Sequence, residues 1–139
     1  MLLLDTHVWV WALEGETRRI GRRTRALLAR AEAGDTVRVS PVSVFEVTAL
    51  QTLGRLRFTQ RPDEWIREAL QASGVRIAEL SASAAVEAGS ITREALPDPL
   101  DRLLVATARH MHATFLTCDE RILEYAAIDP GLRVHDARR

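Results

Sequence analysis

Four acidic residues lie where apolar segments end or where helices are expected to begin or pack: Asp5, Glu46, Asp101 and Asp119. A carboxylate next to the apolar interior is costly unless a positive charge joins it. Carboxylate oxygens are hard ligands, so a divalent cation, Mg²⁺ or Mn²⁺, is the simplest partner that all four could share. The pattern therefore predicts a divalent-metal site built from these acids.

Glu46 is the acid that a purely structural role explains least. Its neighbours three and four residues away along the expected helix are Val42, Ser43, Ala49 and Leu50, and no basic residue lies within one helical turn. An acid on a mostly apolar helix face is expected to be partly buried, and it then needs a partner. Glu46 therefore favours a functional interpretation.

Helix capping is the alternative role for the aspartates. Aspartate is a common N-cap after a strand, so Asp5 and Asp119 could each begin the helix that follows. Asp98, directly before Pro99, is expected to be an N-cap, and a supporting role at the site stays open for it. Asp101 lies in the first helical turn, where the helix dipole favours an acid. The sequence leaves capping and metal binding both open for these residues.

Length and composition bound the class of protein. The chain has 139 residues, 47% of them hydrophobic, which suits one globular domain spanning residues 1–139. No apolar run approaches the roughly 20 residues of a membrane span, and the run at 2–4 is too short for a signal peptide. Cys118 is the only cysteine, which excludes an internal disulfide and a thiolate zinc cluster. We expect a cytoplasmic protein with no membrane association.

The charge of the chain indicates its function less clearly than the four acids do. The formal net charge is zero, so overall charge provides no argument for nucleic-acid binding. All 19 basic residues are arginines, and they gather at 18–25 and 55–61. Such clusters can hold phosphates, but they can equally form a solvated helix face and an exposed loop.

Apolar periodicity predicts strands alternating with helices. Strands are expected at 2–4, 37–40, 75–80, 114–117 and, at an edge, 132–135. Helices are expected at 20–31, 41–53, 62–74, after Ser81, at 100–112 and at 119–125, whereas 8–13 is a helix only if Asp5 or Thr6 caps it. This alternation predicts a parallel α/β sheet. Sites in open parallel sheets lie at the carboxyl ends of strands, so Asp5 and Asp119 should share one edge.

Four short motifs, in order along the chain, resemble those of a known family. They are Asp5-Thr6-His7-Val8-Trp9, Ser40-Pro41-Val42-Ser43-Val44-Phe45-Glu46, Asp98-Pro99-Leu100-Asp101-Arg102-Leu103-Leu104-Val105-Ala106 and Leu116-Thr117-Cys118-Asp119-Glu120. Together they resemble PIN-domain ribonucleases, most closely the VapC toxins of bacterial toxin–antitoxin pairs. The resemblance covers nearly the whole chain and implies a single PIN-like domain, with a parallel sheet between layers of helices in an α/β/α sandwich.

The resemblance also implies the site residues. The family's acidic quartet, which is catalytic and binds metal, is matched by Asp5, Glu46, Asp101 and Asp119. Its supporting positions are matched by Thr6, Ser43, Asp98, Arg102 and Thr117. One departure is visible, because similar toxins often carry a histidine between Leu-Pro and Asp-Pro, whereas here Leu96-Pro97 runs directly into Asp98-Pro99.

The implied activity is metal-dependent endoribonuclease action. The ion would activate a bound water for attack on the scissile phosphorus, and the hydroxyls of Thr6, Ser43 and Thr117 would orient carboxylates or water. Arg102 would pair with an acid or contact phosphate. The implied partners are an RNA substrate, a second copy of the chain and a VapB-like antitoxin whose C-terminal segment occupies a groove. Candidates for lining that groove are residues 8–11, for which a place in the core is the alternative.

Rival functions fit the residues less well. A phosphohydrolase of the haloacid dehalogenase type needs an aspartate two residues after its nucleophilic aspartate, and His7 occupies that place. Cys118 has no histidine near it in sequence, and the four histidines form no zinc-binding spacing. A catalytically silent PIN-like module that only binds RNA or protein is the main alternative, and the intact acidic quartet argues against it.

Overall fold

The computed structural model describes residues 1–57, 60–71 and 74–139. Its centre is a parallel five-stranded sheet with the strand order β3-β2-β1-β4-β5. The strands are β1 (Leu2–Leu4), β2 (Val37–Val39), β3 (Val75–Ile77), β4 (Thr114–Thr117) and β5 (Arg133–Asp136). Leu2 is in register with Val37 on one side and Thr114 on the other, so β1 is the middle strand.

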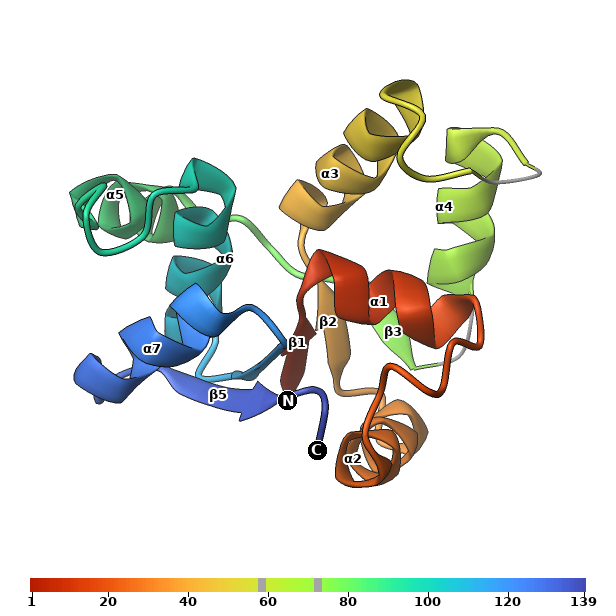
Figure 1. The fold of residues 1–139 in the computed structure, drawn as a ribbon, viewed down its shortest axis with the longest axis horizontal. Coiled ribbons are helices and arrows are strands. Elements are labelled where there is room, and N and C mark those ends of the chain that lie inside the picture. The colour runs from red at the N-terminus through yellow and green to blue at the C-terminus, as the bar shows by residue number, and fades with distance from the viewer. Residues whose placement is uncertain (58–59, 72–73) are drawn as a thin grey trace.

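Helices cover both faces of this sheet. They are α1 (Thr6–Leu13), α2 (Arg22–Ala33), α3 (Pro41–Thr52), α4 (Pro62–Gln71), α5 (Ala82–Ser90), α6 (Pro99–His110) and α7 (Glu120–Ile128). Figure 1 shows α5, α6 and α7 on one side of β1, and α1, α2 and α4 on the other. The predicted parallel α/β sheet flanked by helices is thereby confirmed.

Two apolar clusters hold these layers together, one on each face of the sheet. Leu2 and Leu4 point into the cluster shared with α1, α2 and α4, whereas Leu3 points into the cluster shared with α6 and α7. The alternation follows from the strand geometry, in which successive side chains leave opposite faces. A strand buried on both faces needs a continuous apolar run, and Leu2–Leu4 provides one.

Side-chain caps fix where several helices begin. The N-cap side chains that accept a hydrogen bond from a following backbone N–H belong to Asp5, Ser40, Ser81, Asp98 and Asp119. In α3 and α6 the cap is followed by a proline in the first turn, a position where the missing N–H costs nothing. These caps place the start of each helix at a defined position after its strand or loop.

Several boundaries differ from the predicted ones. The segment 8–13 is helical because Asp5 caps it, and the third strand ends at Ile77 rather than at residue 80. The last helix continues to Ile128, three residues beyond the predicted end at 125, because no breaker precedes Asp129-Pro130. The helix from Pro62 ends at Gln71, and residues 72–73 of its predicted range lie outside the described part of the chain.

The prediction that residues 8–11 line a surface groove is wrong for most of them. Val8, Trp9 and Val10 are 0%, 1% and 6% exposed, and they belong to the apolar cluster beneath α1. Only Trp11 keeps part of its side chain at the surface. The apolar run is the buried face of a short helix, so the core alternative holds for the first three.

Among the described residues, no helix is both long and apolar enough to cross a membrane.

Candidate functional site

Two of the four acids meet at the carboxyl edge of the sheet, as predicted. Asp5 directly follows β1, Asp119 lies just past β4, and these two strands pair in parallel. Thr117 joins them, because its Oγ1 donates to Asp5 Oδ2 over 2.6 Å and accepts the Asp119 backbone N–H over 3.0 Å. The hydroxyl therefore sets the relative position of the two acids.

Asp5 is the most deeply buried of the acids, with 8% of its surface exposed. Its Oδ1 accepts the Thr6 backbone N–H over 2.8 Å, which makes it the N-cap of α1. Burial raises the pKa of this carboxyl above its usual value, although the hydrogen bonds from Thr117 and Thr6 act in the opposite direction. Asp5 is thus both a cap and a member of the site.

Glu46 reaches the same edge from α3. Thr6 Oγ1 donates to Glu46 Oε1 over 2.7 Å and lies 2.9 Å from the hydroxyl oxygen of Ser43. Partial burial is the main reason that the Glu46 pKa is raised, and the negative charges of Asp5 and Asp98 raise it further. The prediction of a partly buried acid on an apolar helix face is therefore confirmed for this residue.

Asp101 completes the group from the first turn of α6. Its pKa is raised to about 8, first by burial and then by the charges of Asp98, Asp5, Asp119 and Glu46. The other four acids therefore lie within electrostatic range of Asp101, and we call these five residues the acid cluster. Carboxylates gathered in this way repel one another, which favours protonation of Asp101.

No arginine neutralises the acid cluster within the described part of the chain. The ion pairs found there, such as Arg109 with Asp129 or Arg138 with Asp136, all use other acids. Arg102, predicted to pair with an acid or contact phosphate, instead donates weakly to the Pro97 carbonyl over 3.4 Å, and its buried Nε has no hydrogen-bond partner. None of the described arginines therefore supplies the positive charge that buried acids at this edge require.

The chemistry of the acid cluster suits a hard divalent cation. Carboxylate oxygens, raised pKa values and the absence of a neutralising arginine from the described residues all indicate a site that a cation would stabilise. Across residues 1–57, 60–71 and 74–139, no three carboxylate, imidazole or thiol groups are placed to bind one ion together. Mg²⁺ commonly uses only one or two carboxylates and keeps several waters, which is compatible with this spacing.

Two further aspartates of the acid cluster are also helix caps. Asp98 is exposed and accepts the Leu100 N–H over 2.8 Å as the N-cap of α6, which confirms its predicted role. Asp119 caps α7 through one oxygen, Oδ1, which accepts the N–H groups of Arg121 and Ile122 at 2.8 and 3.4 Å. A cap therefore occupies only one oxygen of each carboxylate.

The sequence analysis missed two residues near this edge. His7, which was given no role at the site, is exposed, and its charge lowers the pKa of both Asp5 and Glu46. Asp136 ends β5 and so obeys the strand-end rule that found Asp5 and Asp119, but Arg138 holds it through a double contact at 2.8–2.9 Å. The same rule, applied to the last strand, would have found Asp136.

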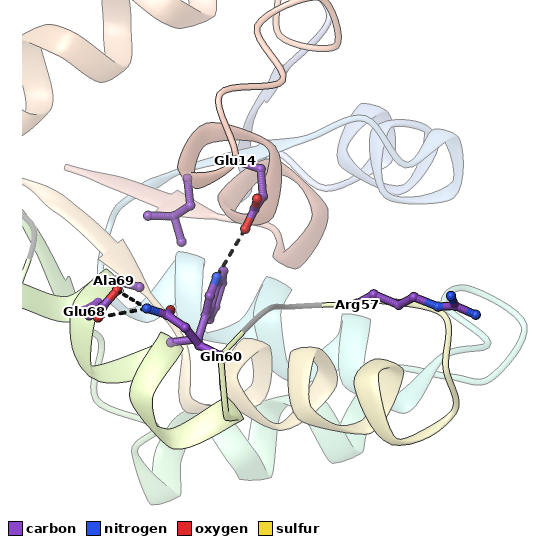
Figure 2. A pocket seen from close by; sticks show the side chains of 7 residues that line it. Glu14, Arg57, Gln60, Glu68 and Ala69 are labelled. Atoms are coloured by element: carbon purple, nitrogen blue, oxygen red, sulfur yellow. Dashed lines mark hydrogen bonds between the residues drawn. The ribbon is translucent and has the colours of Figure 1, made fainter.

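A separate hollow of about 410 Å³ lies between the end of α1 and α4. Figure 2 shows its polar groups turned toward one another, with Arg57 directed away from them. Trp65 Nε1 donates to Glu14 over 3.2 Å, and the Gln60 amide donates to both oxygens of Glu68 at 2.9–3.0 Å. No member of the acid cluster lines this hollow.

Comparison with known proteins assigns the family. The sequence model of the PIN domain matches residues 2–128, nearly the whole chain. The chain belongs to the PIN-domain family. Members of this family are typically nucleases, and they generally use divalent metal ions. No curated protein matches the sequence.

Solved structures share the fold of this PIN domain at low sequence identity. VapBC2 from Rickettsia felis, bound to a DNA fragment from its promoter, matches with a TM-score of 0.68 and 16% identity over 96% of both chains. A toxin–antitoxin complex from Klebsiella pneumoniae matches with a TM-score of 0.62 and 18% identity over 99% of this chain and 98% of the other. DNA-bound VapBC from Salmonella typhimurium matches with a TM-score of 0.65 and 16% identity over 97% of this chain and 96% of the other.

Proposed function

We propose that this PIN domain is a metal-dependent endoribonuclease, the toxin of a type II toxin–antitoxin pair that acts in the cytoplasm. The observation that carries the catalytic part is the acid cluster. Asp5, Glu46, Asp101 and Asp119 come from four separate segments, and they meet at the carboxyl edge of the sheet without a neutralising arginine among the described side chains. Such a cluster is costly to the fold, which supports a functional reason for keeping it.

Asp5, Glu46, Asp101 and Asp119 would hold Mg²⁺ or Mn²⁺, some of them through water. When bound, the ion supplies a water of lowered pKa and neutralises charge on the phosphate. The side chains of this chain orient those groups. Thr6 fixes Glu46, and Thr117 fixes Asp5, each through one hydroxyl proton.

The remaining supporting residues have distinct tasks in this proposal. Ser43 packs its hydroxyl against that of Thr6 and so limits the rotation of the Thr6 side chain. Asp98 adds negative charge beside Asp101 and Glu46, which strengthens the attraction for a cation. The guanidinium of Arg102, which has an unpartnered Nε, would contact a phosphate of the bound RNA.

The partners follow from the similar structures. One of them is a toxin–antitoxin complex and two are VapBC proteins bound to DNA, which supports a VapB-like antitoxin for this chain. We also propose that the chain, with residues 1–139 as one domain, forms a homodimer. A dilution series by light scattering tests the dimer, and a strictly monomeric chain, both alone and with antitoxin, would rule it out.

RNA cleavage by the purified chain tests the catalytic proposal. We expect single-stranded RNA to be cut in the presence of Mg²⁺ or Mn²⁺ and to stay intact with a chelator. Asp101→Asn should lower the rate by orders of magnitude, because it removes a charge from the cluster while keeping the shape of the side chain. Asp63→Asn is the matched control, since Asp63 is a surface acid in the first turn of α4 that pairs with exposed Arg61.

Two outcomes would contradict the proposal. Full activity of a folded Asp101→Asn variant would remove Asp101 from the site. No cleavage of any RNA, together with no binding of Mg²⁺ or Mn²⁺ by calorimetry, would favour a catalytically silent module that binds RNA or protein. Metal binding without cleavage would indicate a selective nuclease whose substrate was absent from the assay.

A further inference from the structure

Three planar side chains follow one another along α1 and the turn after it, starting beside the acid cluster. The ring of His7 lies 6.1 Å from that of Trp11, between centroids, with the planes tilted by 51°. The guanidinium of Arg19 lies over the same Trp11 ring, 5.4 Å from its centroid. We call His7, Trp11 and Arg19 the planar row.

The outer members of the planar row are open to solvent. His7 is exposed, the Arg19 side chain is 62% exposed, and Trp11 between them is partly buried against the core. Glu16 holds the Arg19 guanidinium in place through an ion pair at 2.8 Å. Two exposed planar groups therefore flank a tryptophan that is anchored in the core.

The planar row begins at the site itself. His7 directly follows Thr6, the residue that holds Glu46. From there α1 leads away from the end of β1 toward the segment that enters α2 (Figure 1). Exposed Arg18, Arg22 and Arg23 follow in that segment. A chain lying along this path would meet the acids first, then flat rings, then positive charges.

We propose that the planar row binds the bases of a single-stranded RNA segment next to the bond cut at the acid cluster, an inference that rests on the nuclease function proposed above. Unpaired bases stack on aromatic rings and on guanidinium planes, whereas bases inside a duplex are already stacked on one another. The arginines beyond Trp11 would follow the backbone phosphates. The row therefore selects unpaired RNA.

A protein partner would use this surface less well. An acidic protein segment could also pair with these arginines, but it carries no planar bases to stack on Trp11 and Arg19. Arg19 is a planar cation and exposed arginines lie beside it, which suits an anionic chain that carries aromatic bases. The observations thus favour nucleic acid.

Binding to dye-labelled oligonucleotides in chelator, followed by fluorescence anisotropy, tests the planar row without cleavage. Two ligands of equal length are compared, an adenosine oligomer and an abasic oligomer with the same phosphates. His7→Asn should weaken binding of the adenosine oligomer by about 5- to 100-fold and leave the abasic oligomer unchanged, because stacking contributes per base. Arg19→Lys, which keeps the charge but loses the plane, should act in the same way.

His112→Asn is the matched control for His7→Asn. His112 is an exposed histidine at the other end of α6 from Asp101, and asparagine tolerates its positive φ of 50°. This control should bind both oligomers as the wild type does. Thermal unfolding of every variant checks that the fold is intact.

The outcomes separate the planar row from the nuclease. The planar-row proposal fails if the variants bind the adenosine oligomer like the wild type, or if they lose affinity for both oligomers equally. This holds even when the wild type cleaves RNA. Equal affinity of the wild type for single-stranded and duplex RNA also overturns it. If the wild type shows base-dependent binding that the variants lose, but neither cleaves RNA nor binds Mg²⁺ or Mn²⁺, base binding by the planar row stands and the nuclease proposal fails.

Discussion

The hydroxyl of Thr6 donates to Glu46 Oε1 over 2.7 Å and so ties the first residue of α1 to the second turn of α3. Thr6 is 1% exposed, so no water replaces this donor easily. The bond lowers the pKa of Glu46 against the effect of burial, and it therefore favours the charged carboxylate that a cation needs. The first prediction tests this contact.

Thr6→Val should reduce the rate of metal-dependent RNA cleavage by about 10- to 100-fold, the range found when a group that orients a metal ligand is removed. Valine fills nearly the same volume but donates no hydrogen bond, so Glu46 loses its fixed position. Thr6→Ser keeps the hydroxyl and should retain most of the activity. Equal losses in the two variants, measured under single-turnover conditions, would show that packing rather than the hydroxyl matters.

Added Mg²⁺ or Mn²⁺ should raise the melting temperature of the wild type by several degrees. A ligand at about 100 times its Kd stabilises the folded state by roughly 2.7 kcal/mol, if it does not bind the unfolded chain. Glu46→Gln should show a clearly smaller rise, whereas the surface variant Asp63→Asn should respond like the wild type. Equal responses in all three proteins would place the bound ion outside the acid cluster.

The metal-free chain should lose stability as the pH rises from about 4 to 8. Asp101 has a folded-state pKa of about 8, above the roughly 3.9 of an unfolded aspartate. Between those values the folded state keeps a proton that the unfolded state has released, so the free energy of unfolding falls as pH rises.

Asp101→Asn removes this proton linkage. Urea unfolding in chelator should therefore give a flatter dependence on pH for the variant, with a gain of about 1–2 kcal/mol over the wild type near pH 8, after allowance for solvent screening. Parallel curves for the two proteins would mean that Asp101 titrates normally.

Asp119 can be tested for its two roles separately. Asp119→Asn keeps an oxygen that can accept the N–H groups of Arg121 and Ile122, whereas Asp119→Ala removes the cap of α7. The alanine variant should lose about 1 kcal/mol of stability and the asparagine variant much less. Both should lose RNA cleavage. If the cleavage rate of the two variants falls only in step with their loss of stability, Asp119 acts as a helix cap alone.

Local patterns in the sequence were sufficient to predict the strands and the edge where Asp5 and Asp119 meet, and they offered Asp5, Asp98 and Asp119 as helix caps. Leu2–Leu4 has the continuous apolar run of a central strand, and Asp5 follows it at the position of both a strand end and an N-cap. Parallel strands then bring Asp5 and Asp119 to one edge without further information. These features depend on neighbours within a few residues.

The contacts that arrange the site could not be predicted in this way. Thr6 meets Glu46 across 40 positions of sequence, and Thr117 meets Asp5 across 112. Such pairings depend on how whole elements pack. The sequence left residues 8–11 open between a surface groove and the core for a related reason, since a segment that is apolar throughout does not indicate which side chains face the core.

The strand order has a consequence for how the site appears during synthesis. β1 is made first, yet its partner β4 and the residues Thr117 and Asp119 come more than 100 positions later. A growing chain therefore holds Asp5 beside an open strand edge, without the hydroxyl that orients it. We expect no cleavage-competent centre until β4 has left the ribosome and docked, so a nascent copy would be harmless to the RNAs of the machine that makes it.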